Sequence, residues 1–356
     1  MYSIEEITNN IFVGNCLDLL KNYPDESVDC LCTSPPYYKK RAYGTNYQVW
    51  DGDPKCEHDW EISDKMLKHK KCTKCNAWLG ELGQEPKPED YVRHLVHIFT
   101  EFKRVMKSSG TMWINIGDTY YNTEFGKHEY LKPKDLIGIP WLLAIELQKA
   151  GFYLRNDIIW HKVNPMPRSM KDRCTEAHEY IFFFTKKPEY FYDMDKIREP
   201  MLHKCYSGGT KVVTHNKDHK TVTVDKEGNV KQQNRLSSKA TVPNEKGKIK
   251  RDVWDCNVVS STKSLADVKK LGLEFHHAMY SEGLIEPCVK AGCPEGGIVY
   301  DPFMGSGTTA IVALKNKCNY TGTELSEDYK KIIEARIETI DLDQISGNNT
   351  LKELFE

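Results

Sequence analysis

The chain carries, at residues 297–309, the stretch Gly-Ile-Val-Tyr-Asp-Pro-Phe-Met-Gly-Ser-Gly-Thr-Thr, and this stretch decides the fold. It predicts a short buried strand, a glycine-rich turn, and a helix that begins at Thr308 or Thr309 and runs on through apolar residues. Two glycines in the turn, Gly305 and Gly307, let the backbone approach a ligand closely. The N-terminus of the helix favours an anionic group on that ligand.

A second strand is predicted at 319–323, and it ends at Glu324. An acidic residue in this place can accept hydrogen bonds from ribose hydroxyls. The two strands together therefore indicate a nucleoside ligand with an anionic end. The spacing Gly305-x-Gly307-x-x-Ala310 also satisfies a dinucleotide-binding fingerprint, which is a weak signal by itself.

A loop near the other end of the chain, Thr-Ser-Pro-Pro-Tyr at 33–37, follows an apolar strand. The prolines fix the backbone and remove two donors, so the loop offers a stiff row of acceptors that includes the Ser34 hydroxyl. Tyr37 adds a flat ring. These parts suit a planar group that carries an amine, and hydride transfer has no need of them. Taken alone, the loop is also compatible with an ordinary Pro-Pro turn. Both motifs follow strands, and ligands of open α/β sheets gather at the carboxyl ends of strands.

In this order, the two motifs resemble those of the beta class of S-adenosylmethionine-dependent DNA amino-methyltransferases. Further matching stretches lie at 14–20, 115–118, 159–167 and 324–337, and the resemblance covers roughly residues 10–50, 85–197 and 252–340. It implies a Rossmann-like fold, a mixed and mostly parallel sheet with helices on both faces. The helices expected at 91–106 and 140–149 and the strands expected at 156–160 and 180–185 agree with an α/β fold.

The resemblance also implies a mechanism and a set of site residues. The exocyclic amine of a flipped base attacks the methyl carbon of S-adenosylmethionine directly. Ser34 and the Pro35 carbonyl hold the amine, Pro36 completes the loop, and Tyr37 stacks on the extruded base. The residues implied in cofactor binding lie in the loops after the predicted strands; they are Asn15, Asp301, Phe303, Gly305, Gly307, Thr308, Thr309 and Glu324. The family usually carries Asp at the place of Asn15, whose amide can still contact adenine.

The residue before Pro-Pro-Tyr bears on the base that is methylated. By association within the family that the chain resembles, Ser34 favours N4 of cytosine, and N6 of adenine is the alternative. A catalytically silent DNA-binding module and a methyltransferase acting on RNA or protein amines also stay open. The presence of Ser34, Tyr37, Asp301 and Glu324 weighs against the silent module.

Cysteine pairs occur in two settings. Cys56, His58, Cys72 and Cys75 lie in a short, Lys-rich insertion that is expected to be loop-like, and they offer four ligands for a structural zinc ion. The alternative is two incidental pairs. Cys30 and Cys32 flank the catalytic loop, but they follow the pattern of a core strand. We interpret this second pair as packing residues and not as nucleophiles for methylation at carbon 5 of cytosine.

Residues 201–251 hold twelve Lys or Arg against four acids in a chain whose net charge is −1. The segment is interpreted as part of a target-recognition region that contacts double-stranded DNA through phosphates and base edges. A disordered linker is the alternative.

The predicted organisation follows from these motifs. The catalytic half comprises 1–50 and 85–197, separated by the Cys/His insertion at 51–84, and the target-recognition region covers 198–270. The S-adenosylmethionine-binding half covers 271–345, and a tail follows at 346–356. A length of 356 residues suits one catalytic domain with insertions.

Twelve cysteines without a signal pattern or a long apolar run indicate a cytoplasmic protein with no membrane contact. The resemblance implies that it is bacterial or phage-encoded. A cognate restriction endonuclease is expected, if there is one, as a separate chain, and the sequence does not indicate an oligomeric state.

Two further roles stay open. Asp118 either forms part of the active-site wall or caps a turn. His276, His277 and Tyr280 either line the cofactor pocket or cap a helix.

Overall fold

The computed structural model describes residues 1–63, 69–167, 169–200, 245–258 and 280–340. The chain divides into two compact units: Met1–Asp193 together with Arg251–Glu356, and Met194–Lys250. Two parts of the predicted recognition region 198–270, residues 201–244 and 259–270, lie outside the described residues, as do His276 and His277.

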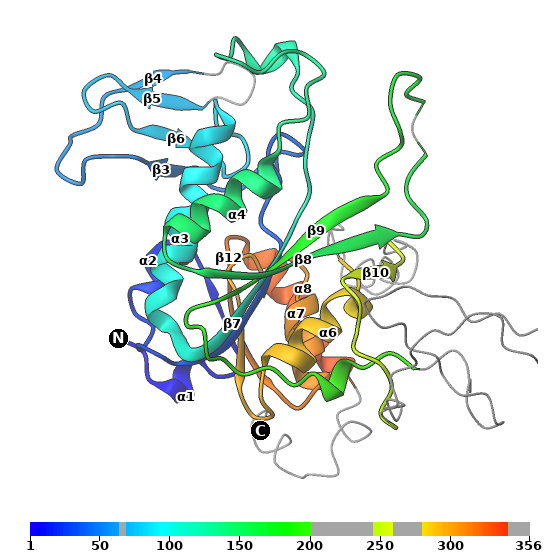
Figure 1. Ribbon diagram of the computed structural model, residues 1–356. Coiled ribbons are helices and arrows are strands. Elements are labelled where there is room, and N and C mark those ends of the chain that lie inside the picture. Colours follow the sequence, from blue (N-terminus) through cyan, green and yellow to red (C-terminus); the bar gives the residue numbers. More distant parts are fainter. Residues whose placement is uncertain (64–68, 168, 201–244, 259–279, 341–356) are drawn as a thin grey trace, which may run out of the picture. The chain divides into compact units, whose positions relative to one another are not determined.

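The first unit is built on a sheet of eight strands (Figure 1). Its spatial order is β1 (Asn10–Val13), β12 (Asn319–Glu324), β11 (Ile298–Asp301), β2 (Val28–Thr33), β7 (Met106–Ile116), β9 (His178–Thr185), β8 (Tyr153–Lys162) and β10 (Val253–Cys256). Only β9 runs against its neighbours; every other pairing is parallel. The predicted mixed, mostly parallel sheet is confirmed.

Helices cover both faces of this sheet, as Figure 1 shows. On one face α2 (Cys16–Leu20) packs against α3 (Pro88–Val105), and α3 packs against α4 (Ile139–Lys149). On the other face α6 (Glu282–Gly292), α7 (Thr308–Lys315) and α8 (Glu327–Glu338) pack in sequence order. In its described residues the unit also has two short helical segments, α1 (Ile4–Ile7) and the 3₁₀ turn η1 (Thr123–Phe125).

The predicted elements agree closely with the observed ones. The helix expected at 91–106 begins at Pro88 because proline favours the first helical turn. The strands expected at 156–160 and 180–185 are longer, since β8 and β9 form a long antiparallel pair. Strands β2 and β11 are buried on both faces, as parallel strands between two helix layers must be.

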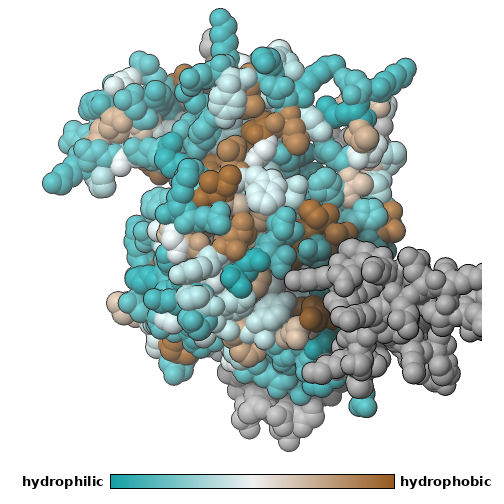
Figure 2. Space-filling view, in the orientation of Figure 1, coloured by the Kyte–Doolittle hydropathy of each residue, from teal (hydrophilic) through white to brown (hydrophobic). Residues whose placement is uncertain are grey.

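The core contains the two cysteines that the sequence assigned to packing, together with aromatic residues of β9. Cys30 and Cys32 lie on β2 and are buried, which confirms the packing interpretation. Phe182 and Phe184 are fully buried on β9, and the ring of Phe183 stacks on Trp113 at 4.0 Å. Figure 2 shows that the viewed surface is mostly hydrophilic, with a band of hydrophobic residues in its middle. Within the described residues no helix has the length and apolarity that crossing a bilayer requires.

The Cys/His insertion is a small sheet and not the loop that we expected. Its strands, in spatial order, are β3 (Gln48–Trp50), β6 (Trp78–Gly80), β5 (Lys70–Cys72) and β4 (Trp60–Ile62), and all pairings are antiparallel. Each strand has only three residues, too few for alternation of polar and apolar residues to be recognised in the sequence. The first strand begins before residue 51.

In the second unit the structure describes the 3₁₀ turn η2 (Asp195–Ile197) and an antiparallel bridge between Glu199 and Lys248. Strand β10 lies inside the predicted recognition range 198–270, yet it pairs with β8 as an edge strand of the central sheet.

Candidate active site

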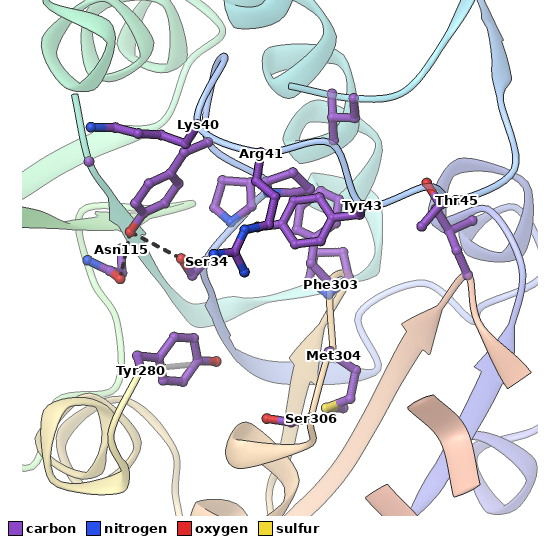
Figure 3. A pocket seen from close by; sticks show the side chains of 18 of the residues that line it. Ser34, Lys40, Arg41, Tyr43, Thr45, Asn115, Tyr280, Phe303, Met304 and Ser306 are labelled. Carbon is purple, nitrogen blue, oxygen red and sulfur yellow. Dashed lines mark hydrogen bonds between the residues drawn. The ribbon is translucent and has the colours of Figure 1, made fainter. Parts of the chain in front are cut away.

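One cavity of about 490 Å³ lies at the edge of the sheet where the loops after β2, β7, β11 and β12 meet (Figure 3). The parallel strands bring their carboxyl ends to this edge, and β9 contributes its beginning because it runs in the opposite direction. Figure 3 shows Ser34 from the β2 loop and Phe303 from the β11 loop at the same hollow. Residues more than 260 positions apart in the sequence therefore share one site.

The structure places most of the predicted site residues on the wall of this cavity. From the catalytic loop these are Ser34, Pro35, Pro36 and Tyr37, and from the predicted cofactor set they are Phe303, Gly305, Thr308 and Glu324. Four other predicted residues do not line it: Asn15, Asp301, Gly307 and Thr309. These four lie directly beside lining residues, and the side chains of Asn15, Asp301 and Thr309 have other partners.

Tyr37 is held by a network of polar side chains. Its hydroxyl lies 2.7 Å from Oε2 of Glu179 and 3.0 Å from Oδ1 of Asn115, and the Ser34 hydroxyl donates to it at 3.3 Å. The ammonium of Lys162 contacts Oε1 of Glu179. Burial, and then the charge of Glu179, raises the pKa of Tyr37 well above its usual range. Tyr37 is therefore a neutral phenol that donates a hydrogen bond within this network.

The ring of Tyr37 needs a glycine beside it. A Cβ atom on Gly117 would lie 2.8 Å from Cε2 of Tyr37, closer than real contacts allow. Gly117 follows β7, one residue after its end. The matching stretch 115–118 thus provides Asn115 as a hydrogen-bond partner and Gly117 as the space for the ring.

Sequence reasoning did not find Glu179, and it named Lys162 only within a matching stretch. Glu179 lies at the start of β9, where a polar residue looks like an ordinary strand boundary. Its register partner on β8 is Trp160, two residues before Lys162. The available signal was a pair of opposite charges at adjoining ends of two antiparallel strands.

Asp301 acts behind the cavity wall. It is buried, and its carboxylate accepts hydrogen bonds from Thr33 Oγ1 at 2.5 Å, Thr309 Oγ1 at 2.6 Å, Tyr280 Oη at 3.1 Å and the Phe303 amide at 3.0 Å. Burial raises its pKa. Asp301 thus joins the end of β2, the start of α7 and the turn that carries Phe303.

Tyr280 lines the cavity, which is one of the two roles that the sequence left open for it; the other was capping a helix. For Asp118 the sequence left open a place in the active-site wall and a capping role, and the structure shows both. It accepts hydrogen bonds from the amides of Gly138 at 2.9 Å and Ile139 at 3.1 Å, which caps α4, and it also lines the cavity.

Glu324 lies at the end of β12 with its carboxylate next to the glycine-rich turn. Oε2 accepts a hydrogen bond from the Gly305 amide at 2.8 Å, and Oε1 accepts one from the Ser326 amide at 3.1 Å. Burial outweighs these hydrogen bonds and raises the pKa of Glu324 to about 7. The side chain is therefore an acceptor whose charge changes near neutral pH.

Gly307 and Asn15 have structural tasks beside the cavity. Gly307 has a φ of +80°, and a Cβ atom there would lie 2.4 Å from Cγ2 of Ile333 on α8. The glycine thus allows α8 to pack against the turn. The side chain of Asn15 accepts a hydrogen bond from the Leu17 amide at 2.9 Å and caps α2, while its neighbours Gly14 and Cys16 line the cavity.

The segment 81–85, directly after the Cys/His sheet, supports the catalytic loop. The Gly83 carbonyl accepts from the Lys39 amide at 2.7 Å, and the Gln84 side chain donates to the Arg41 carbonyl at 2.7 Å. Glu85 is fully buried, and its carboxylate accepts from the Gly83 amide at 2.8 Å and lies 3.0 Å from His94 Nδ1 on α3. This segment therefore connects the small sheet and α3 to the cavity wall.

The four predicted metal ligands come together at the small sheet. The ligand atoms of Cys56, His58, Cys72 and Cys75 lie within 4.8 Å of one another. Cys56 Sγ is 3.9 Å from Cys72 Sγ, and Cys75 Sγ is 3.3 Å from His58 Nδ1. Ligands around a tetrahedral zinc ion stand about 3.8 Å apart at usual Zn–S lengths. The donor set and its spacing fit a zinc ion.

Comparison with known proteins decides the family. A family model described as DNA methylase matches residues 28–335. The chain belongs to this family. A type II methyltransferase of Citrobacter freundii, M.Cfr9I, is 33% identical over 353 residues, covering 94% of this chain and 89% of the relative. The type II methyltransferase M.SmaI of Serratia marcescens is 31% identical over 345 residues, covering 92% and 90%.

Solved structures show the same fold. The cytosine-N4-specific PvuII DNA methyltransferase matches with a TM-score of 0.59 at 17% identity, over 95% of this chain and 90% of that one. A putative DNA modification methylase from Thermus thermophilus, complexed with S-adenosyl-L-methionine, matches with a TM-score of 0.52 at 18% identity over 96% of each chain. The predicted Rossmann-like methyltransferase fold is confirmed. The chain is a S-adenosylmethionine-dependent DNA amino-methyltransferase of the restriction-modification type.

Proposed function

We propose that this DNA methylase transfers a methyl group to N4 of a cytosine that is flipped out of duplex DNA. The observation that carries the proposal is the single cavity lined both by the Ser34–Tyr37 loop and by Phe303 and Glu324. One wall suits a base with an amine, and the opposite wall suits a nucleoside. Catalysis by such a site consists of positioning and electrostatics.

The roles on the base side are those that the resemblance implies, and the contacts of Tyr37 support them. The Ser34 hydroxyl and the Pro35 carbonyl accept hydrogen bonds from the amine, which raises electron density on its nitrogen. Tyr37 stacks on the base and is held in place by Glu179 and Asn115. Bound S-adenosylmethionine supplies the methyl group. Cytosine is preferred because, in the family that the chain resembles, Ser before Pro-Pro-Tyr is associated with cytosine N4. The likeness to a cytosine-N4-specific enzyme supports the same choice. Adenine N6 is the alternative.

On the cofactor side, Glu324 accepts hydrogen bonds from the ribose hydroxyls and Phe303 flanks the adenine. Gly305 and Thr308 approach the rest of the molecule at the N-terminus of α7, where amide groups favour a carboxylate. Asp301, Gly307, Thr309 and Asn15 support this binding from behind, through the contacts of the turn and of α2.

A structural zinc ion on Cys56, His58, Cys72 and Cys75 is a second part of the proposal. Four protein ligands leave no open position for chemistry, so the ion would hold β3–β6 together. Its folding role would be largest at β4 and β5, where Cys72 is the one buried residue of the two strands.

Target recognition is proposed for the basic region 198–270. Its Lys and Arg residues would neutralise DNA phosphates, while Asn, Gln and Arg would read base edges. By analogy with the type II methyltransferases that it resembles, the enzyme would act in the cytoplasm and share its recognition sequence with a restriction endonuclease on a separate chain.

The substrate class is tested by transfer of a labelled methyl group from S-adenosylmethionine to duplex DNA, single-stranded DNA, RNA and protein in parallel. The proposal predicts incorporation that depends on duplex DNA. Equal incorporation into RNA, or incorporation only into protein, would contradict it. Cofactor binding without transfer to any of them would favour a silent module.

A further inference from the structure

An exposed methionine stands at the mouth of the catalytic cavity. The loop that joins β8 to β9 extends beyond the ends of both strands (Figure 1). Within it, the side chain of Met166 is 81% exposed and also lines the cavity. Pro165 and Pro167 flank it and restrict the backbone on both sides. Among the large apolar side chains of the described residues, only that of Met1 is more exposed.

Both arms of this loop are tied to the rest of the first unit. On the β8 arm, Oδ1 of Asn164 accepts a hydrogen bond from the Val258 amide at 2.8 Å. On the β9 arm, the guanidinium of Arg173 lies 3.5 Å from the centroid of the Tyr120 ring. The loop is thus anchored before and after Met166. Met166 is therefore exposed although the loop that carries it is held in place.

The charge around Met166 suits a polyanion. Lys171 and Arg173 follow it in sequence, and Asp172 is the only acid of residues 163–173. Lys162, which precedes Met166, is paired with Glu179. Asp172 is itself paired with Lys134 at 2.6 Å. Cations of this kind can contact phosphates on either side of an inserted side chain.

We propose that Met166 enters the duplex and occupies the space that the target base leaves when it moves into the cavity. This inference rests on the proposed function. Methionine is one of the apolar side chains that proteins insert between base steps, and extruding a base leaves a gap with apolar stacked walls. Met166 is in the right place because it lines the cavity that receives the base. The stacked bases then cover the side chain of Met166, and that side chain fills the gap left by the target base. Both changes favour the flipped state.

Met170 provides a matched control. It lies in the same loop, has the same chemistry and is 47% exposed, but it does not line the cavity. Met166→Ala and Met170→Ala are compared in single-turnover methyl transfer with two duplexes. Both duplexes carry the recognition site, which is mapped first from the methylated bases of DNA treated with the wild-type enzyme. In one duplex the target base is paired, and in the other it faces an abasic nucleotide.

The expected result is a loss of roughly tenfold for Met166→Ala on the paired duplex, and a rate near that of wild type on the abasic duplex. The abasic site removes the pairing that the wedge must replace. Met170→Ala is expected to match wild type on both. S-adenosylmethionine affinity, measured for each variant, should be unchanged because the cofactor side of the cavity is intact.

Equal losses on the two duplexes, or no loss on the paired one, would overturn the role of Met166. Equal losses for both methionine variants would do the same, because they would reflect general DNA affinity. A wild-type enzyme that transfers no methyl group to any DNA would instead overturn the proposed function, and this inference with it.

Discussion

The hydroxyl of Tyr37 lies 2.7 Å from Oε2 of Glu179, and this contact joins the loop after β2 to the start of β9. It fixes the plane of the ring that is proposed to stack on the base. Ser34 belongs to the same network, so its hydroxyl is oriented as well. The base side of the cavity is therefore formed before any substrate arrives.

Replacement of Tyr37 should separate stacking from hydrogen bonding. Tyr37→Phe keeps the ring and loses the contact with Glu179, so we expect a fall of about tenfold in kcat. Tyr37→Ala also loses stacking, which contributes about 1–3 kcal/mol per base, and should lose a further tenfold or more in kcat/KM for DNA. Steady-state methylation assays measure both. Equal activity of the Phe and Ala variants would exclude a stacking role.

Gly117→Ala should displace the ring of Tyr37. The added methyl group would lie 2.8 Å from Cε2, and the ring must move to relieve the overlap. We expect a loss of methyl transfer of at least about tenfold, with unchanged cofactor affinity. Gly283→Ala on α6 is the control, because its nearest neighbour is Cys256 Sγ at 3.9 Å, an ordinary contact. Full activity of Gly117→Ala would show that the position of the ring is unimportant.

The affinity for S-adenosylmethionine should depend on pH through Glu324. The pKa of this carboxyl is raised from its usual value to about 7, so the group is protonated below pH 7 without cofactor. Ribose hydroxyls donate best to the ionised form. Affinity should therefore fall as the pH drops below 7, by up to about tenfold per pH unit. Calorimetric titration between pH 5.5 and 8.5 measures it, and Glu324→Gln should remove the slope.

The raised pKa of Glu324 also predicts the direction in which the stability of the folded protein changes with pH. Because its folded pKa lies above its unfolded pKa, the neutral form stabilises the folded protein at low pH, and this contribution is lost as the pH rises through about 7. In the absence of cofactor, Glu324→Gln should weaken that part of the pH dependence of unfolding. A pH-independent cofactor affinity in wild type would contradict the proposed role of Glu324.

The purified protein should contain about one zinc ion per chain, and Cys72→Ser should reduce the metal content. We also expect this variant to lower the melting temperature and kcat, because segment 81–85 joins the small sheet to the catalytic loop. Cys174→Ser is the matched control, since Cys174 is exposed and outside the cluster. Elemental analysis and thermal unfolding give the readouts. A zinc-free protein with wild-type stability would contradict the zinc site.

The sequence predicted the parts of this site that local motifs encode. The turn after β11 and the Ser-Pro-Pro-Tyr loop could be recognised because strand, turn and ligand-facing residues are contiguous there. The role of Asp301 could not, because its partners Thr33 and Tyr280 converge only in the folded sheet. Glu179 was missed for the same reason. Its function depends on the register of β9 with β7 and β8, which the sequence pattern does not fix.

Analysis of the methylated nucleosides tests the central claim most directly. Duplex DNA is treated with the enzyme and labelled S-adenosylmethionine, digested to nucleosides and examined by mass spectrometry. The proposed function predicts N4-methylcytosine. N6-methyladenine would keep direct transfer to an amine but contradict the choice of base inferred from Ser34. A methyl group at carbon 5 of cytosine, or no modified base while the cofactor binds normally, would contradict the mechanism itself.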